Sequence, residues 1–385
     1  MKITLKKLFV YALSVGLLTG SALAHGSEDD DYDHDGNRLT VCERSANKMF
    51  RSCRSEIREE YFAESAKCLN LGDAGEREEC FDEVRLARRE NRELCGAQRE
   101  ARSNVCDLLM EDRYDPEAFL SPANFETNPG VEGAANRYFS LTPGHTYVAL
   151  AGEDFEETIV VTVTEELREV LMEEDANGDP IEGTGVNCRL VVDIVLVDGE
   201  PVEITDDYYA LALNGDVHYC GEVARNFENG ILDNLDGSFE AGRDLAKSGI
   251  LIKAEPVMHD AHRQEFLLGE AEDVIRYVAG AATPTSVGAG EGGENMRDPG
   301  GRFICNGQCV KTEEFIPPEP GAGEYKYFIA GIGFVLGVAL EDGVPTGERD
   351  ELLCTGESLD VLPDCGISEE TVDLLCELSP VAFCD

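Results

Sequence analysis

The sequence predicts an α+β protein with three structured parts: an N-terminal antiparallel helical hairpin stapled by disulfides, a mainly antiparallel β domain, and a short Cys-rich tail. Three observations support this prediction. Six cysteines are placed symmetrically about residue 74, β-branched segments alternate with turn pairs, and four cysteines fall within residues 354–385. Because no helical period separates the β segments, an antiparallel sheet is favoured over a parallel one.

Residues 1–24 have the composition of a secretory signal peptide. Three lysines precede an apolar stretch at residues 8–18, and Ala22-Leu23-Ala24 is a small-x-small cleavage site. The apolar stretch is too short to favour a membrane span. We therefore expect no stable membrane insertion and a periplasmic or extracellular location, where disulfides persist.

The chain is strongly acidic. Asp and Glu outnumber Lys and Arg by 78 to 32, which gives a net charge of −46. Removal of residues 1–24 takes away three lysines and no acid, which leaves 29 basic residues and a net charge of −49. This charge repels nucleic acid and anionic lipid, so a nucleic-acid partner is excluded. It favours a solvated surface and could also attract divalent cations.

The hairpin is predicted from cysteine spacing. Paired from the outside inward, the residue numbers of each pair sum to 148, for Cys42 with Cys106, Cys53 with Cys95, and Cys68 with Cys80. Antiparallel helices rise equally per residue, so such pairs lie level with one another. The turn residues 70–75 lie at the centre of symmetry. We expect a hairpin with three nested disulfides at residues 42–109, after an acidic disordered lead-in at 25–41.

A linker with three prolines is predicted at residues 110–137, and the β domain at 138–353. Residues 158–164 and 186–197 are rich in β-branched side chains, and Asp198-Gly199 turns the second run into 202–213. Further strands are predicted at 217–223, 303–315, 326–330, 334–340 and 349–353, and a Gly-rich loop at 279–300.

The remaining cysteines also favour disulfides. Cys188 and Cys220 fall on two predicted strands, so we expect them to be bridged. Zinc sites use two close C-x2-C pairs, whereas Cys305 and Cys309 form a single C-x3-C pair that favours a local bridge. The sequence does not fix the pairing of these two or of the tail cysteines Cys354, Cys365, Cys376 and Cys384. A short helix is expected after Ser368, a good N-cap residue, up to Leu378.

A resemblance covers residues 138–353. The blocks YFSLTPGHTY at 138–147, RQEF at 263–266, GEAED at 269–273 and KYFIAGIGFV at 326–335 resemble a family of secreted, mostly uncharacterised bacterial proteins. That family shares a YF-L-PG-T-Y … RQE … GEAED … KYY-G-G-V pattern, which implies one antiparallel β domain and no established activity. The opening and closing blocks also resemble lipoprotein-carrier-type half-barrels, which hold apolar ligands. His145, His218 and His259 stand where these patterns have aromatic or small residues.

Two acidic loops have the spacing of calcium ligands. Carboxylates at alternate positions turn inward around a cation, and glycine permits the sharp bend. The twelfth position of the first loop is Cys42 instead of the bidentate Glu of an EF-hand, and Pro180 replaces the glycine of the second. The alternative is an acidic solvated turn. The candidate ligands are Asp31, Asp33, Asp35 and Asn37 in the first loop, and Asp175, Asn177 and Asp179 in the second.

A second candidate metal site combines three histidines with carboxylates. Imidazole and carboxylate suit zinc, copper or iron, and the H-x-x-H spacing fits one helical turn. Histidines that hydrogen-bond or lie on the surface are the alternative interpretation. The candidate ligands are His218, His259 and His262, with Glu222, Glu265 or Glu270.

No G-x-S-x-G, H-E-x-x-H or P-loop motif occurs, and no catalytic residue is assigned. We expect an exported, non-enzymatic binding or envelope-interaction protein. Its expected ligand is a divalent cation, with calcium as the suggested cofactor, or an apolar small molecule; an envelope protein is the other expected partner. The alternative is a metal-dependent hydrolase or oxidoreductase that uses His218, His259 and His262. The ligand and the oligomeric state are left open.

Overall fold

The computed structural model describes residues 38–116, 120–131, 133–152, 155–175, 177–282 and 309–384. The predicted signal peptide and the first calcium loop, with Asp31, Asp33, Asp35 and Asn37, lie outside these residues. Residues 40–385 form one compact unit, and the helices and strands of the described part lie within it. The predicted α+β class, with its hairpin, antiparallel sheet and Cys-rich tail, is confirmed.

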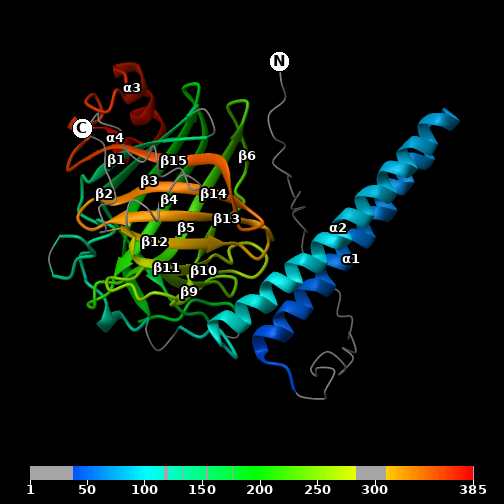
Figure 1. The fold of residues 1–385 in the computed structure, drawn as a ribbon, viewed down its shortest axis with the longest axis horizontal. Helices are drawn as coiled ribbons and strands as arrows, with labels where there is room; N and C mark the ends of the chain where they lie inside the picture. The colour runs from blue at the N-terminus through cyan, green and yellow to red at the C-terminus, as the bar shows by residue number, and fades with distance from the viewer. Residues whose placement is uncertain are drawn as a thin grey trace. The chain divides into compact units, whose positions relative to one another are not determined.

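The hairpin consists of α1 (Val41–Leu69) and α2 (Ala74–Leu109), which run antiparallel in Figure 1. Thr40 and Glu43 form a capping box at the start of α1. The Asp73 carboxylate accepts the amides of Gly75 and Glu76 at the start of α2. The predicted mirrored disulfides are confirmed: Cys42–Cys106, Cys53–Cys95 and Cys68–Cys80.

The hairpin depends on these disulfides because it buries little apolar surface. Only Ala46, Ile57 and Cys68 of α1 are buried. The bridges span sequence separations of 64, 42 and 12 residues. A disulfide that closes a loop of this size restricts the unfolded chain, and on this entropic account each bridge stabilises the folded state by about 3–4 kcal/mol. The covalent ties thus replace the hydrophobic core that a two-helix element lacks.

The sheet is antiparallel throughout and coils upon itself. Its order is β10-β8-β5-β4-β3-β2-β1-β15-β14-β13-β12-β11-β9, and β6 and β7 also pair with β5. The two edge strands, β9 (Ala261–Arg263) and β10 (Glu265–Phe266), are separated in sequence by Gln264 alone. The first and last strands of the sheet are therefore neighbours (Figure 1). The other strands are β1 (Thr146–Ala151), β2 (Glu157–Leu171), β3 (Gly185–Val197), β4 (Glu200–Leu211), β5 (Val217–Glu228), β6 (Ile231–Asn234), β7 (Phe239–Glu240), β8 (Lys247–Ile252), β11 (Val274–Ala282), β12 (Cys309–Phe315), β13 (Ala322–Ile329), β14 (Gly333–Glu341) and β15 (Val344–Gly356).

The two faces of the sheet bury different cores. Val161, Tyr209, Tyr219 and Phe328, from strands far apart in the sheet order, share one cluster on the inner face. On the outer face, Val160, Val192 and Ile204 pack against the tail helices α3 (Glu369–Leu378) and α4 (Pro380–Phe383). Side chains alternate along each strand, so neighbouring positions serve opposite cores.

The tail and the strand cysteines are paired in the structure. Cys188–Cys220 joins β3 to β5, as predicted. The tail bridges, which the sequence left open, are Cys354–Cys365 and Cys376–Cys384. Cys309 is also disulfide-bonded, and Cys305 lies outside the described residues. Ser368 caps α3 by accepting the Thr371 amide, as expected.

Three details differ from the sequence predictions. Strand β11 continues to Ala282, so residues 279–282 of the predicted Gly-rich loop belong to a strand, and the rest of that prediction lies outside the described residues. Residues of the predicted linker pack on the sheet, where Leu120 and Phe125 are buried. The strands β1 and β6 to β11 were not predicted because none of them contains a long run of β-branched residues. Across the described residues, no helix combines the length and apolar character needed to cross a membrane.

Candidate functional site

The three candidate histidines occupy different environments. His218 is buried on β5 with its ring 5.0 Å from that of Phe125, and burial lowers its pKa to about 4. His262 on β9 places Nε2 3.4 Å from the Tyr277 hydroxyl, and burial lowers its pKa to about 3. His259 lies in an exposed turn with φ of 70°. The imidazoles of His218 and His262 are therefore neutral at physiological pH.

Within the described part of the chain, no three His, Cys, Asp or Glu side chains form a group that could hold a metal ion. In the second predicted calcium loop, the Asp175 carboxylate accepts the amides of Asn177 and Asp179 at 2.7 and 3.1 Å. These bonds lower the Asp175 pKa and form a side-chain-capped turn. Glu270 is exposed, whereas Glu222 and Glu265 face the interior of the sheet, where they lie among other acidic side chains. The sequence did not indicate this arrangement.

Glu222 and Glu265 belong to a cluster of seven acidic side chains, called here the carboxyl cluster. Burial is the main cause that raises the pKa of each member, and repulsion between neighbouring acids raises most of them further. The pKa is raised to about 7 for Asp207 and Glu324, and to about 6 for Asp273 and Asp350. The members are Asp193, Asp207, Glu222, Glu265, Asp273, Glu324 and Asp350.

The sheet register brings two of these acids directly together. Asp207 on β4 pairs with Glu222 on β5. The Tyr219 hydroxyl lies 2.6 Å from Glu222 Oε2 and is also hydrogen-bonded to Asp207 Oδ1. A phenol has one proton and can donate to one oxygen only. One of the two carboxyl groups must therefore be protonated and donate to the phenol oxygen.

A second carboxyl pair lies beside the first. Interaction between the side chains of Glu265 and Asp273 raises the pKa of Glu265 and lowers that of Asp273, which favours one proton in the pair. The charges of Glu222 and Asp207 raise the pKa of Glu265 in addition to burial and the Asp273 charge. The four acids thus form one electrostatically connected group.

A lysine neutralises the opposite end of the cluster. Lys326 Nζ lies 2.8 Å from Glu314 Oε2 and 3.4 Å from Glu324 Oε2. Burial opposes the charged form of Lys326, but these carboxylates outweigh it and raise its pKa. Among the described residues, no basic side chain forms an ion pair with Asp207, Glu222, Glu265 or Asp273. The charge of Lys326 also lowers the pKa of Asp273, whereas no cation is among the causes that shift the pKa of Asp207, Glu222 or Glu265.

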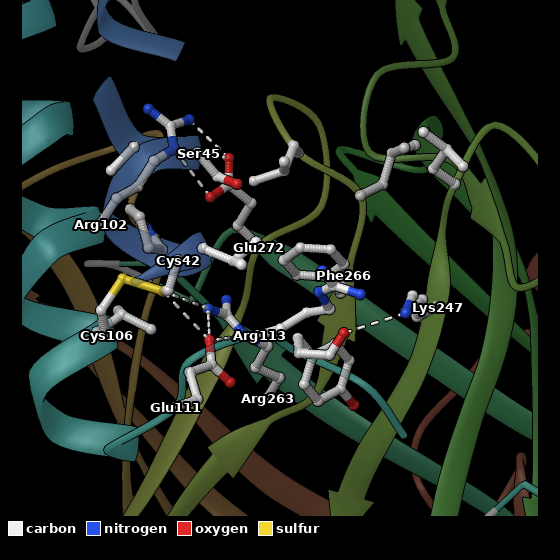
Figure 2. Close-up of a pocket in the computed structure, with 18 of the residues that line it drawn as sticks. Cys42, Ser45, Arg102, Cys106, Glu111, Arg113, Lys247, Arg263, Phe266 and Glu272 are labelled. Atoms are coloured by element: carbon white, nitrogen blue, oxygen red, sulfur yellow. Dashed lines mark hydrogen bonds and ion pairs between the residues drawn. A yellow bond between two sulfur atoms is a disulfide. The ribbon is translucent and has the colours of Figure 1, made fainter. Parts of the chain in front are cut away.

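A separate cavity, called here the junction pocket, lies between the hairpin and the β8–β10 edge of the sheet (Figure 2). Its volume is about 580 Å³. Most of its lining is apolar, including Val41, Ala46, Val105, Phe266 and Leu267. The Cys42–Cys106 disulfide forms part of the wall. Volume and lining fall within the range of small-molecule sites.

Two buried ion pairs hold the walls of the pocket together (Figure 2). Arg102 on α2 binds both carboxylate oxygens of Glu272 at 2.6–3.0 Å, and the exposed fractions of the two side chains are 7% and 2%. Arg263 pairs with Glu111, and its guanidinium lies 4.8 Å from the Phe266 ring centroid. Both pairs join the hairpin region to the sheet with matched charge, and Arg102–Glu272 also has the forked geometry in which both carboxylate oxygens accept.

The rim of the junction pocket carries further charges. Lys247 Nζ donates to the carbonyl oxygen of Tyr114 at 3.1 Å. Arg113 is exposed, as is the acidic rim residue Asp244. Within the described residues, neither Lys247 nor Arg113 forms an ion pair with a carboxylate. In a chain with a net charge of −46, unmatched basic side chains beside an apolar cavity are an unusual local feature.

Comparisons with known proteins give limited guidance. No protein-family model matches this chain, and no curated protein matches it closely enough to count as a relative. It is similar to the structure of a protein described as exported, with a YmcC-like fold, from Bacteroides fragilis (11% identity, TM-score 0.29, covering 58% of this chain and 98% of that chain). It is also similar to a protein described as a lipoprotein from Parabacteroides distasonis (11% identity, TM-score 0.27, covering 58% and 99%). At these TM-scores, neither likeness bears on the function of this chain.

Proposed function

We propose that this protein is an exported binding protein whose junction pocket takes an apolar ligand with an anionic group. The observation that carries the proposal is the combination of an apolar cavity of about 580 Å³ with two unmatched basic side chains at its rim. Disulfide-bonded cysteines throughout the described chain support a location outside the cytoplasm.

The charge distribution indicates where the anionic group would bind. Arg102 and Arg263 are already satisfied by Glu272 and Glu111, so they are not available to a ligand. Among the described residues, Lys247 donates only to a backbone carbonyl, which leaves two of its three N–H donors for an anion. Arg113 adds a second positive charge. The apolar chain of the ligand would then lie against Val105, Phe266 and Leu267.

Isothermal titration calorimetry with dodecanoate, and with uncharged dodecanol, tests the proposal. Dodecanoate is expected to bind one-to-one and more tightly than dodecanol. Lys247→Gln should weaken dodecanoate binding about tenfold, which corresponds to one charge-assisted hydrogen bond of about 1.4 kcal/mol. Lys67→Gln, an exposed lysine of α1, is the matched control.

Filling the cavity provides an independent measurement. Ser45 lines the junction pocket from α1, so Ser45→Trp should abolish binding. Ser55→Trp, at an exposed position of the same helix, should leave it unchanged. Equal binding by both tryptophan variants would show that the cavity is only a packing gap between the hairpin and the sheet.

A further inference from the structure

The carboxyl cluster shares no residue with the junction pocket and has no role in the proposed function. We infer that four acids of the cluster that form no ion pair among the described residues, Asp207, Glu222, Glu265 and Asp273, are a binding site for the ammonium group of a small primary amine.

An unpartnered oxygen is the first reason to expect a ligand. The Glu265 side chain belongs to a residue that is 7% exposed, and its Oε2 atom is buried. Within the described residues, no donor reaches this oxygen. Buried carboxylate oxygens are normally hydrogen-bonded because an unmet acceptor destabilises the folded state. Oε2 is therefore a ready acceptor on a carboxyl group whose pKa the charges of the other three acids raise.

The excess of negative charge is the second reason. The contacts of the Tyr219 hydroxyl with Asp207 and Glu222 require one proton in that pair. The interaction between Glu265 and Asp273 favours one proton in the second pair. Two negative charges then remain on four closely placed groups. Like charges in a water-poor interior repel strongly, so a ligand cation would be favoured.

Lys326 shows that this interior accommodates an ammonium group. Its Nζ donates to Glu314 at 2.8 Å and lies 3.4 Å from Glu324 at the other end of the cluster. An ammonium has three N–H donors, which suit several convergent carboxyl oxygens. A ligand amine would make the equivalent interactions where the protein supplies no lysine.

The surroundings favour an ammonium over a metal ion. No group of three metal-ligating side chains exists among the described residues, these four acids included. Tyr219 stacks on Tyr209 with ring centroids 4.7 Å apart and meets Phe239 edge-on at 5.2 Å. Aromatic faces attract organic cations. Glu222 and Asp273 are half-buried, whereas Asp207 and Glu265 are buried, so a ligand would enter past the first two.

The test is calorimetry on the full secreted chain at pH 7.5 with 1,4-diaminobutane, tetramethylammonium and calcium chloride. We expect one-to-one binding of the diamine and none of tetramethylammonium, which has charge but no N–H donor. Glu265→Gln should weaken diamine binding at least tenfold, and Glu222→Gln should do the same. Glu228→Gln, at an exposed position on the same strand as Glu222, should not change it.

Three results would overturn the inference. The first is the absence of diamine binding, the second is binding of calcium in place of the diamine, and the third is binding at multiple weak sites that persists in Glu265→Gln. The last result would identify attraction to the acidic surface. Circular dichroism checks that each variant is folded. Failure of dodecanoate binding at the junction pocket would leave this measurement unaffected, since the two sites share no residue.

Discussion

The junction pocket and the carboxyl cluster both bury charged side chains, but they balance the charge in opposite ways. At the junction, each guanidinium has its own carboxylate: Arg102 with Glu272, and Arg263 with Glu111. In the interior of the sheet, Lys326 forms ion pairs with Glu324 and with Glu314 outside the cluster, and the other six cluster acids form no ion pair among the described residues. Matched pairs fix two parts of a structure in register, whereas unmatched acids must take up protons or a cation.

This difference separates a structural joint from a candidate site. Removing one partner of a matched pair leaves the other buried and uncompensated. Removing one acid from an overcrowded group relieves repulsion. The same chemical substitution should therefore have opposite signs in the two regions, and the following experiments test that contrast.

The largest effect is expected at the junction. Glu272→Ala leaves the nearly fully buried Arg102 without a partner, and should lower the free energy of unfolding by about 3–5 kcal/mol. The double variant Arg102→Met/Glu272→Leu should recover most of this loss because it leaves no buried charge. Urea denaturation measures both. A double variant no more stable than Glu272→Ala would mean that the pair contributes through specific geometry.

The pH dependence of stability should come next. A carboxyl whose pKa is raised on folding binds protons more tightly in the folded state, so stability is present at low pH and is lost as pH rises through the folded pKa. For Asp207 this window runs from 3.8 to about 7, and for Asp273 from 3.8 to about 6. His218 and His262 have lowered pKa values, so they reduce stability as pH falls below 6.5. The seven acids of the carboxyl cluster outnumber these two histidines, so their effect on stability should dominate.

We therefore expect a higher melting temperature at pH 5.5 than at pH 7.5, by on the order of 5 °C. Differential scanning calorimetry at constant ionic strength measures it. In Asp207→Asn the difference should shrink, whereas Asp233→Asn on the exposed strand β6 should leave it intact. A melting temperature that falls on acidification would show that the cluster is not the dominant titrating group.

A smaller effect of opposite sign to that at the junction is expected for Glu265→Gln. The amide removes a charge that burial and neighbouring acids disfavour, so the free energy of unfolding at pH 7.5 should rise by about 1 kcal/mol. At pH 5 the gain should be smaller because the carboxyl is protonated. Chemical denaturation at the two pH values gives the comparison, and destabilisation at pH 7.5 would contradict the repulsion argument.

The smallest effect concerns the rim of the junction pocket. Lys247→Gln removes a partly exposed cation that forms no ion pair among the described residues, so stability should change by less than about 0.5 kcal/mol. Only dodecanoate binding should respond. Thermal melting with and without dodecanoate separates the two readouts, and a stability loss comparable with that of Glu272→Ala would place Lys247 among the structural charges.

The hairpin could be predicted from the sequence because its cysteine spacing obeys a rule of helix geometry. The strands were predicted where β-branched residues run together, as in β2 and β3. The junction could not be foreseen: Arg102 and Glu272 are 170 residues apart, and no local pattern links them. The carboxyl cluster did leave a trace, since Asp193 interrupts the apolar run Val191-Val192-Asp193-Ile194-Val195 on β3. Glu222 and Glu265 were recognised as candidates, but as companions of histidines instead of other acids.

The nested disulfides also determine how the protein would respond to cutting and to mechanical load. A protease that cleaves the turn at Leu71-Gly72 would leave two fragments tied by three sulfur bridges, so the nick would be visible only after reduction. Tension applied ahead of Val41 would pass through Cys42 directly to Cys106 and on to the sheet. The helical hairpin between these two cysteines, which are separated by 64 positions in the sequence, would bear no force. Pulling on the amino-terminal end could therefore not unfold the hairpin.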